Sequence, residues 1–217
     1  NKLPIKNIFG IDIDKLPYSV AKTYLTLYFG PVKHKIIEKV MLRENGLYNY
    51  GNNWDVVISN PAGGSVYPHR YERKILKEGL QNLTGKKHKF SEYELSVQQA
   101  VRSVKVGGKI CLILPKGFFS NYHDNFLRKY VAKHCRVLAI ISLPSGVFRV
   151  GTSVKEKSGG SRVGQMKMAI IYAKKIKEIE ADIDLSQENG KWAYPVFTAS
   201  VSKPKNATEV ICDWLEK

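Results

Sequence analysis

Short apolar runs alternate along this chain with longer stretches that have helical spacing. The runs at 54–59, 109–115 and 137–144 are rich in Val, Ile and Leu and end sharply at turn residues, which predicts buried β-strands. Helices are predicted between them. One begins with Ser91 as its cap and Glu94 at its third position and continues through Val104, and another spans 124–133. Strands and helices in this order form a sheet that is covered on both faces. We therefore expect an α/β fold with a doubly wound, mostly parallel sheet.

The N-terminal segment predicts another strand and helix. A short strand ends at two alternating acids, Asp12 and Asp14, and a helix with Pro17 in its first turn runs to the stop at Gly30-Pro31. Asp14 is well placed as the helix N-cap. An acid at this strand end binds a ribose diol in nucleotide-binding doubly wound folds, which makes Asp12 a candidate ligand contact. The alternative is that either acid is only a loop or cap residue.

The end of the chain is less regular. An edge strand is expected at 39–42, and a final strand at 166–174 after a Gly/Ser-rich, basic loop at 151–164. No helix separates that last strand from the one at 137–144, so we expect the two to be antiparallel neighbours. Residues 1–175 form the expected core domain. Residues 176–217 form a C-terminal extension of unclear role, with a short helix near 208–215.

A distinctive polar exit follows the strand at 54–59. The chain continues Asn60-Pro61-Ala62-Gly63, and the carboxyl ends of strands are where α/β sheets bind ligands. Asn60 and Pro61 could present a side-chain amide and a rigid carbonyl to a planar polar ligand. The alternative is a plain turn, because Asn, Pro and Gly are ordinary turn residues.

The charge balance favours a polyanionic partner. The chain has 35 Lys and Arg against 19 Asp and Glu, a formal net charge of +16. Nucleic acid is the usual partner of such a domain, and a merely lysine-rich surface is the alternative. The basic segment at 63–91 is expected to be a long loop, either a solvated insertion or a lid that meets phosphates. Its candidate DNA-binding residues are Arg70, Arg73, Lys86 and Lys87.

The cysteines and the apolar runs of the chain argue against a disulfide-bonded, metal-binding or membrane-spanning protein. The three cysteines are far apart and form no Cys-x-x-Cys pair, which favours a reduced, cytoplasmic chain and predicts no metal site. No apolar run approaches the roughly 20 residues that a membrane span needs. We therefore expect no membrane partner.

Four segments, in register along the chain, resemble adenine-specific DNA methyltransferases. The resemblance is to the modification subunit of type I restriction–modification systems, and it covers roughly residues 5–175. It implies a Rossmann-like methyltransferase fold, S-adenosylmethionine as cofactor, DNA as substrate, and specificity and restriction subunits as partners. The segments that carry it are Gly10–Asp14, Asp55–Pro61, Glu94–Pro115 and Leu143–Phe148.

The resemblance also implies roles for individual residues. In this family an adenine is flipped out of the duplex, and its amine attacks the cofactor methyl group without a metal or a nucleophilic side chain. Asn60 would accept a hydrogen bond from that amine through its side chain, and Pro61 would do so through its backbone carbonyl. Asp12 would hold the cofactor ribose and Ile13 would pack on the cofactor adenine. Asn45 stands where the family has an acid for the cofactor amine.

Two departures from the family pattern leave other functions open. The family motif continues with Pro and an aromatic residue that stacks on the base, whereas this chain has Ala62-Gly63; Phe148 and Tyr67 are candidates to replace that stacking. No Gly-x-Gly segment precedes Asp12, so the glycine-rich cofactor loop and first strand are missing from this sequence. The alternatives are a fragment, a degenerate module that binds DNA or protein, and a methyltransferase that acts on RNA or protein.

Overall fold

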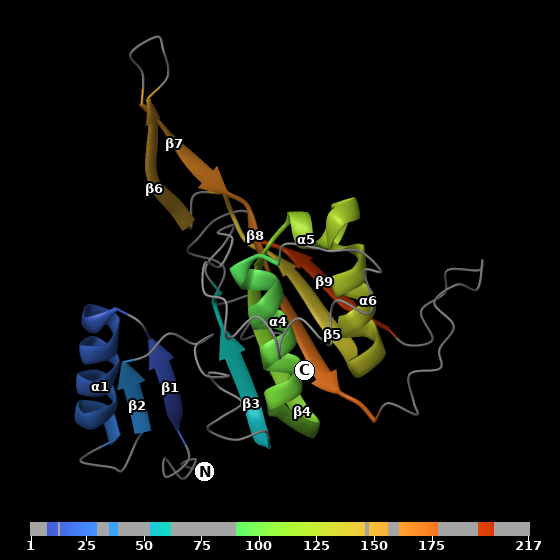
Figure 1. Cartoon of the computed structure of the whole chain (residues 1–217), viewed down its shortest axis with the longest axis horizontal. Helices are drawn as coiled ribbons and strands as arrows, with labels where there is room; N and C mark the ends of the chain where they lie inside the picture. Colours follow the sequence, from blue (N-terminus) through green and yellow to red (C-terminus); the bar gives the residue numbers. More distant parts are fainter. Residues whose placement is uncertain are drawn as a thin grey trace.

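A computed structural model of the 217-residue chain shows a small N-terminal sheet, a larger main sheet and a projecting arm of paired strands, with helices packed beside the two sheets (Figure 1). It describes residues 8–12, 14–29, 35–38, 53–61, 90–145, 148–155, 161–177 and 195–201. Several predicted segments lie outside these ranges: the strand at 39–42, most of the loop at 63–91 and the helix near 208–215.

The N-terminal unit contains strand β1 (Phe9–Asp12), helix α1 (Lys15–Phe29) and strand β2 (Lys35–Glu38). The two strands are parallel, with Phe9 opposite Lys35 and Asp12 opposite Glu38. The predicted first strand and helix are confirmed, and the helix ends just before Gly30-Pro31. The second strand of this sheet lies at 35–38, earlier in the chain than the edge strand expected at 39–42.

The main sheet has five strands in the order β3 (Trp54–Ser59), β4 (Val104–Pro115), β8 (Met168–Lys175), β5 (Cys135–Ser142) and β9 (Phe197–Ser200). Strands β3 and β4 are parallel, as are β5 and β9, and β8 is antiparallel to both β4 and β5. The mostly parallel sheet is therefore confirmed, as is the antiparallel pairing of the last predicted strand with the strand at 137–144. The four-residue edge strand β9 was not predicted.

This topology places the ends of three parallel strands together at one edge of the sheet. The carboxyl ends of β3, β4 and β5 lie where the antiparallel strand β8 begins. We call this end the carboxyl edge; it carries Asn60, Lys116, Leu143 and Lys167. The opposite end, where β4 and β5 begin and β8 ends, is the amino edge.

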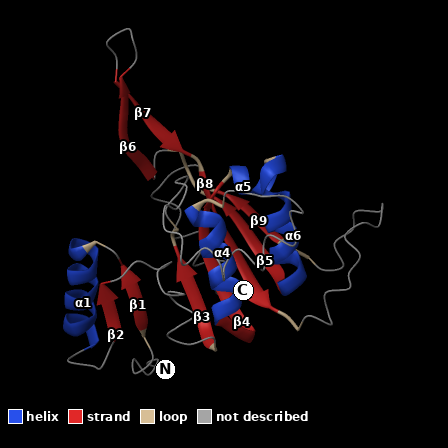
Figure 2. Cartoon of the chain, viewed as in Figure 1, coloured by secondary structure: helices blue, strands red, loops and turns tan. Residues whose placement is uncertain are grey.

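Two helices cover one face of the main sheet (Figure 2). Helix α4 (Glu92–Ser103) packs on β3 and β4, and helix α6 (Asn125–His134) packs on β5 and against α4. Between them lie helix α5 (Gly117–Ser120) and a single 3₁₀ turn at 122–124. The core is formed by alternate strand residues and the inner helix faces: Ile110, Leu112, Leu114, Leu95, Val101 and Leu127 are all buried.

Helix α4 begins as predicted and ends earlier than predicted. Ser91 is the N-cap residue, as predicted, and its backbone N–H donates to Glu94 Oε2 at 2.5 Å. The helix ends at Ser103, and β4 starts at Val104 instead of near Lys109. Glycines permit this longer strand: Gly107 has φ +83°, and a Cβ on Gly108 would lie 2.8 Å from the Asp55 carbonyl oxygen. This is the stretch in which the pairing of β3 with β4 shifts register.

Strand β3 is less buried than its sequence predicts. Val57 is 6% exposed, whereas Val56 is 53% and Ile58 is 75% exposed. Among the described residues β3 pairs only with β4, and α4 packs on the face that carries Val57. The prediction of a fully buried strand is therefore wrong for two of its three apolar side chains, because strand burial depends on what covers each face.

The predicted loop at 151–164 contains two strands instead. Strands β6 (Phe148–Lys155) and β7 (Ser161–Met166) pair antiparallel and form a two-stranded arm, the β6–β7 ribbon. Glycine and serine dominated the prediction, but Val150, Thr152 and Val154 alternate with other residues at the period of a strand. None of the helices in the described part of the chain has the length and apolarity to cross a membrane.

Candidate active site

Asn60 stands at the carboxyl edge, directly after β3. It is exposed, and the following Pro61 is buried. Ser59 pairs with Leu112, and β4 continues three residues further to Pro115, so the exit of β3 lies beside the last residues of β4. The Asn60 side chain makes no hydrogen bond to another described residue. Its amide can therefore bind a ligand while Pro61 anchors the backbone behind it.

The carboxylates of Asp12 and Asp14, at the end of β1, accept different backbone hydrogen bonds. Asp14 Oδ1 accepts the Leu16 N–H at 3.1 Å, which confirms Asp14 as the cap of α1. Asp12 is half-buried, and its Oδ1 accepts the Asp14 N–H at 2.8 Å. This bond fixes the Asp12 carboxylate, and its other oxygen, Oδ2, accepts no hydrogen bond from the described residues. Asp12 is thus the more buried of the two acids, and its Oδ2 faces no donor among the described residues.

An aromatic contact links the two sheets. Phe9 and Trp54, the first residues of β1 and β3, stack with ring centroids 5.3 Å apart and an interplanar angle of 29°. Strands β1 and β3 run in the same direction (Figure 1). Their carboxyl ends, with Asp12 and Asn60, therefore point to the same side of the molecule.

Two lysines at the carboxyl edge were missed by sequence reasoning. The Lys116 N–H donates to the Lys167 carbonyl oxygen at 2.9 Å, which joins the exit of β4 to the entry of β8. Lys116 is half-buried and Lys167 is exposed. Lys116 could have been found, because it follows Pro115 at a predicted strand end. Lys167 could not, because its position depends on the order of strands in the sheet.

A polar network supports the chain that leaves β4. The Tyr93 hydroxyl donates to the buried carboxylate of Asp124, and burial, together with this hydrogen bond, raises the pKa of Tyr93 well above its ordinary value. Arg128 Nη1 donates to the carbonyl oxygens of Phe118 at 2.7 Å and Asn121 at 2.8 Å. These bonds tie α5 to α4 and α6, so they hold the segment after Lys116 in place.

The remaining predicted site residues stay predictions. Phe148 begins β6, but the surroundings of its side chain lie outside the described structure. Residues 62–89 lie outside it as well. Whether another side chain replaces the aromatic residue that Ala62-Gly63 lacks therefore stays a prediction. The same holds for Ile13 and Asn45, which are predicted to contact the cofactor, and for Arg70, Arg73, Lys86 and Lys87.

Comparison with known proteins places this arrangement in a family. The profile of the N-6 DNA methylases matches residues 1–157. The methylase subunit of the type I restriction enzyme EcoEI of Escherichia coli is 24% identical over 156 residues, which are 69% of this chain and 29% of that protein. RM.BcgI of Heyndrickxia coagulans, a type II restriction enzyme and methyltransferase, is 24% identical over 144 residues, 65% of this chain and 20% of that protein. The chain thus spans less than a third of the length of these relatives.

Solved structures show the same fold. A Listeria monocytogenes protein assigned to the class I S-adenosylmethionine-dependent methyltransferases superposes with a TM-score of 0.59 at 22% identity, over 96% of this chain and 54% of that chain. The methyltransferase subunit of a type I restriction–modification system from Streptococcus thermophilus gives a TM-score of 0.56 at 17% identity, over 78% of this chain and 34% of that chain. At these identities the likeness establishes the Rossmann-like methyltransferase fold. The family profile covers most of the sequence, and the chain belongs to the N-6 DNA methylase family.

Proposed function

We propose that this chain is the catalytic part of an adenine-specific DNA methyltransferase, of the kind that forms the modification subunit of type I restriction–modification systems. One observation carries the proposal: Asn60 is exposed at the carboxyl end of β3, is followed by buried Pro61, and lies at a strand end that faces the same side of the molecule as the strand end at Asp12. Membership of the N-6 DNA methylase family supports the reaction. The restriction enzymes among its relatives support the biological setting.

The described residues fit part of an S-adenosylmethionine site. A ribose diol needs a fixed acceptor at a strand end, and Asp12 has one carboxylate oxygen held by the Asp14 N–H and the other available. Asp12 would therefore hold the ribose. Ile13 would pack on the adenine ring of the cofactor, and Asn45 would contact its amine. When bound, the cofactor supplies a methyl group on a positively charged sulfur.

Asn60 and Pro61 would prepare the amine of the target adenine. That amine is a poor nucleophile because its lone pair is delocalised into the ring. The Asn60 side-chain carbonyl and the Pro61 backbone carbonyl would accept its two N–H bonds, which concentrates electron density on nitrogen and fixes its direction. Positioning of this kind and placed dipoles account for the catalysis, with no nucleophilic side chain. The base must leave the duplex to reach these groups.

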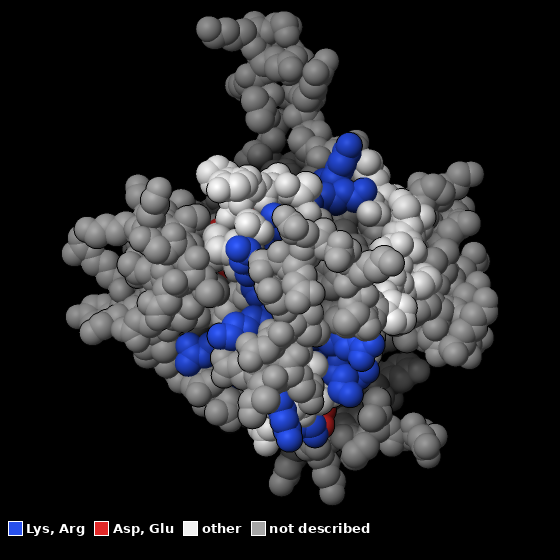
Figure 3. All heavy atoms as spheres, turned by 90° about the vertical axis from the view of Figure 1, so that its right-hand side faces the viewer, with Lys and Arg blue, Asp and Glu red and all other residues white. Residues whose placement is uncertain are grey.

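The surface charge suits a DNA substrate. The net charge is +16, and Figure 3 shows a face on which Lys and Arg dominate the charged side chains of the described residues. We propose that a specificity subunit reads the target sequence and that a restriction subunit joins the same complex, in the cytoplasm. In that arrangement the basic surface of this chain binds the phosphate backbone, which carries no sequence information.

The test is methyl incorporation into duplex DNA by the protein at its native full length. We expect Asn60→Ala to lower incorporation at least a hundredfold, with cofactor affinity measured by calorimetry unchanged. The matched control is Asn53→Ala, because Asn53 is an exposed asparagine just before the same strand. We expect this control to keep the activity of the native protein.

Each contrary outcome excludes a specific part of the proposal. Full activity of Asn60→Ala would remove Asn60 from the mechanism. Salt-sensitive DNA binding without any cofactor heat would identify a degenerate binding module. Methyl transfer to RNA or protein, with none to DNA, would replace the substrate.

A further inference from the structure

The β6–β7 ribbon is attached to the sheet at the carboxyl edge. Strand β5 ends there at Ser142 and β8 begins there at Met168, so the ribbon between them starts and finishes at this edge. Its base is held by two backbone hydrogen bonds: Lys116 N–H to Lys167 O at 2.9 Å and Leu143 N–H to Met168 O at 3.0 Å. Figure 1 shows the ribbon projecting away from the sheet. The ribbon is therefore attached on the side of the molecule that carries Asn60.

Within the described residues, the ribbon pairs with no other strand. β6 and β7 form a separate two-stranded sheet, with Phe148 opposite Met166 at the base and Lys155 opposite Ser161 at the tip. The register shifts between Arg149 and Ser153, and such irregularities increase the twist of a ribbon. A lone two-stranded ribbon is marginally stable in water, so a surface that binds along it would stabilise it.

The charge of the ribbon indicates the chemistry of that surface. Its two strands contain the basic residues Arg149, Lys155 and Arg162 and no Asp or Glu. The exposed Lys167 adds a fourth positive charge at the base. An arm with this composition favours a polyanionic surface over an apolar one.

The dimensions of the ribbon match one groove of duplex DNA. Its longer strand has 8 residues and spans about 27 Å at roughly 3.4 Å per residue, the axial length of about eight base pairs. Two strands about 4.8 Å apart give a ribbon about 10 Å wide. The major groove, about 12 Å wide, admits such a ribbon, whereas the minor groove, about 6 Å wide, does not.

We propose that the β6–β7 ribbon lies in the major groove of the duplex beside the adenine bound at Asn60, with Arg149, Lys155 and Arg162 on the flanking phosphates. The inference rests on the proposed function, because it takes duplex DNA as the substrate. In the sheet order, β8 and β3 are separated only by β4, so the ribbon base lies about 10 Å from the Asn60 strand. The ribbon thus orients the duplex relative to the site, whichever subunit reads its sequence.

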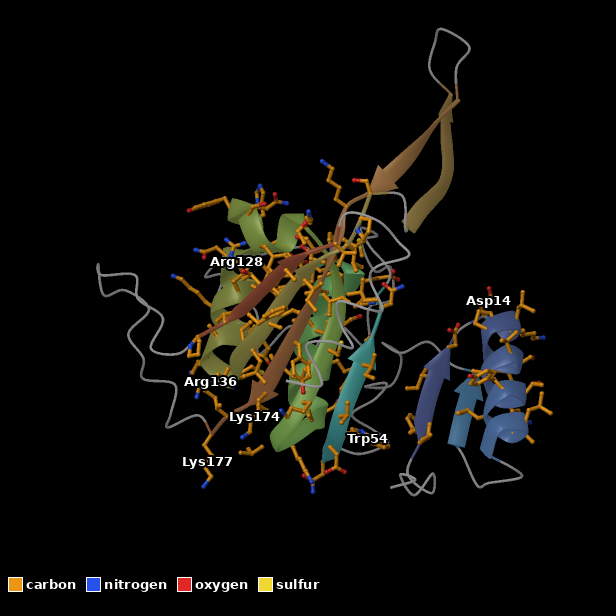
Figure 4. The ribbon with its side chains drawn as sticks, turned by 180° about the vertical axis from the view of Figure 1, so that it is seen from behind. Asp14, Trp54, Arg128, Arg136, Lys174 and Lys177 are labelled. Atoms are coloured by element: carbon orange, nitrogen blue, oxygen red, sulfur yellow. The ribbon has the colours of Figure 1, made fainter. Side chains whose placement is uncertain are left out.

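The test compares two charge-matched variants of the full-length protein. One replaces Arg149, Lys155 and Arg162 with Gln in the ribbon. The control replaces Arg136, Lys174 and Lys177 with Gln; these are exposed and lie together at the amino edge (Figure 4). Binding to a duplex of about 30 base pairs is measured by fluorescence anisotropy over a series of salt concentrations, with thermal unfolding as the check of folding.

We expect the ribbon variant to bind the duplex at least tenfold more weakly at low salt. The slope of log affinity against log salt should become shallower by about 2.7, or about 0.9 for each phosphate that the ribbon no longer neutralises. The control should keep the native slope. A duplex with glucosylated 5-hydroxymethylcytosine, whose sugar fills the major groove, should bind the native protein at least tenfold more weakly and leave the already weakened ribbon variant nearly unaffected.

Several results would overturn this placement. The slope of log affinity against log salt could stay native in the ribbon variant and become shallower in the control. That result would place the duplex at the amino edge. Equal binding of the glucosylated and plain duplexes would exclude the major groove. In both cases a methylation defect of Asn60→Ala would leave the proposed function standing, whereas absence of both methylation and DNA binding in the native protein would reject the function itself.

Discussion

Phe9 and Trp54 stack across the two sheets, with ring centroids 5.3 Å apart. Each is the first residue of its strand, β1 or β3, and both are half-buried. The contact joins the strand that ends at Asp12 to the strand that leads to Asn60. In the proposed function, one residue holds the cofactor and the other the target base. If that function holds, the stack sets the relative position of Asp12 and Asn60 through the opposite ends of their strands.

A double-mutant cycle with Phe9→Leu and Trp54→Leu tests this role. Stacked aromatic pairs contribute about 0.5–1.5 kcal/mol beyond the area that they bury, so we expect a coupling energy of about 1 kcal/mol in urea unfolding. Each single variant should also weaken S-adenosylmethionine binding severalfold, because Asp12 loses its fixed position. Phe90 and Phe126, 6.0 Å apart in the main core, provide the control pair. Their cycle should show coupling in unfolding without a change in cofactor affinity; a coupling near zero for Phe9 and Trp54 would contradict the prediction.

Substitutions of Asp12 and Asp14, at the end of β1, should affect different properties. Asp14 should matter for the stability of the fold and Asp12 for cofactor affinity. Asp14→Ala removes the cap of α1, which accepts the Leu16 N–H, and should lower the free energy of unfolding by about 1 kcal/mol. Its cofactor affinity should stay within twofold of native. Asp12→Asn keeps the size of the side chain but loses the charged acceptor, so it should lower cofactor affinity at least tenfold at near-native stability. Calorimetry measures the cofactor affinity and urea unfolding the stability. Loss of affinity in Asp14→Ala and loss of stability in Asp12→Asn would contradict the prediction.

Local signals made part of this structure predictable. Ser91 and Glu94 marked the start of α4, and the absence of a helix before the last strand gave the antiparallel pairing of β8 with β5. The position of Asn60 followed from a strand end that the sequence states clearly. In each case the deciding interaction lies within a few residues of the chain, or in the length of one connection.

Features that depend on distant partners were not predictable. The exposure of Ile58 reflects what covers each face of β3, and the position of Lys167 at the carboxyl edge reflects the strand order. The β6–β7 ribbon was interpreted as a loop because glycine and serine are shared by loops and by bent strands. Strand β9 has four residues, too few for its alternation to be distinguished from chance.

Val57 and Ile58 are neighbours in β3 but differ in burial, so the same kind of substitution should change the stability of the protein by different amounts. Val57→Thr places a hydroxyl at a 6% exposed position and should lower the free energy of unfolding by about 1–2 kcal/mol. Ile58→Thr changes a side chain that is 75% exposed and should stay within about 0.5 kcal/mol of native. Urea unfolding of the two variants measures both values. A larger loss for Ile58→Thr than for Val57→Thr would mean that the Ile58 face is the covered one.

The buried thiol of Cys135 should make the protein sensitive to alkaline pH. Burial raises the pKa of this thiol from about 9 to about 12, although the nearby Lys175 partly offsets the rise. Between these values the unfolded chain loses the thiol proton and the folded chain keeps it. Stability from this group is therefore fully present below pH 9 and falls as the pH rises toward 12, by at most about 1.4 kcal/mol per pH unit.

In Cys135→Ala the free energy of unfolding should fall less steeply with rising pH, by up to about 1.4 kcal/mol per pH unit. The free energy of unfolding is measured in urea at several pH values from about 8 to about 11 for the native protein and the variant. The cavity left by the substitution shifts the whole curve by a constant, and Tyr93 titrates equally in both proteins, so the difference in slope isolates the thiol. Parallel curves would show that Cys135 ionises at the same pH in the folded and unfolded chains, which would contradict its burial between β5 and the helices.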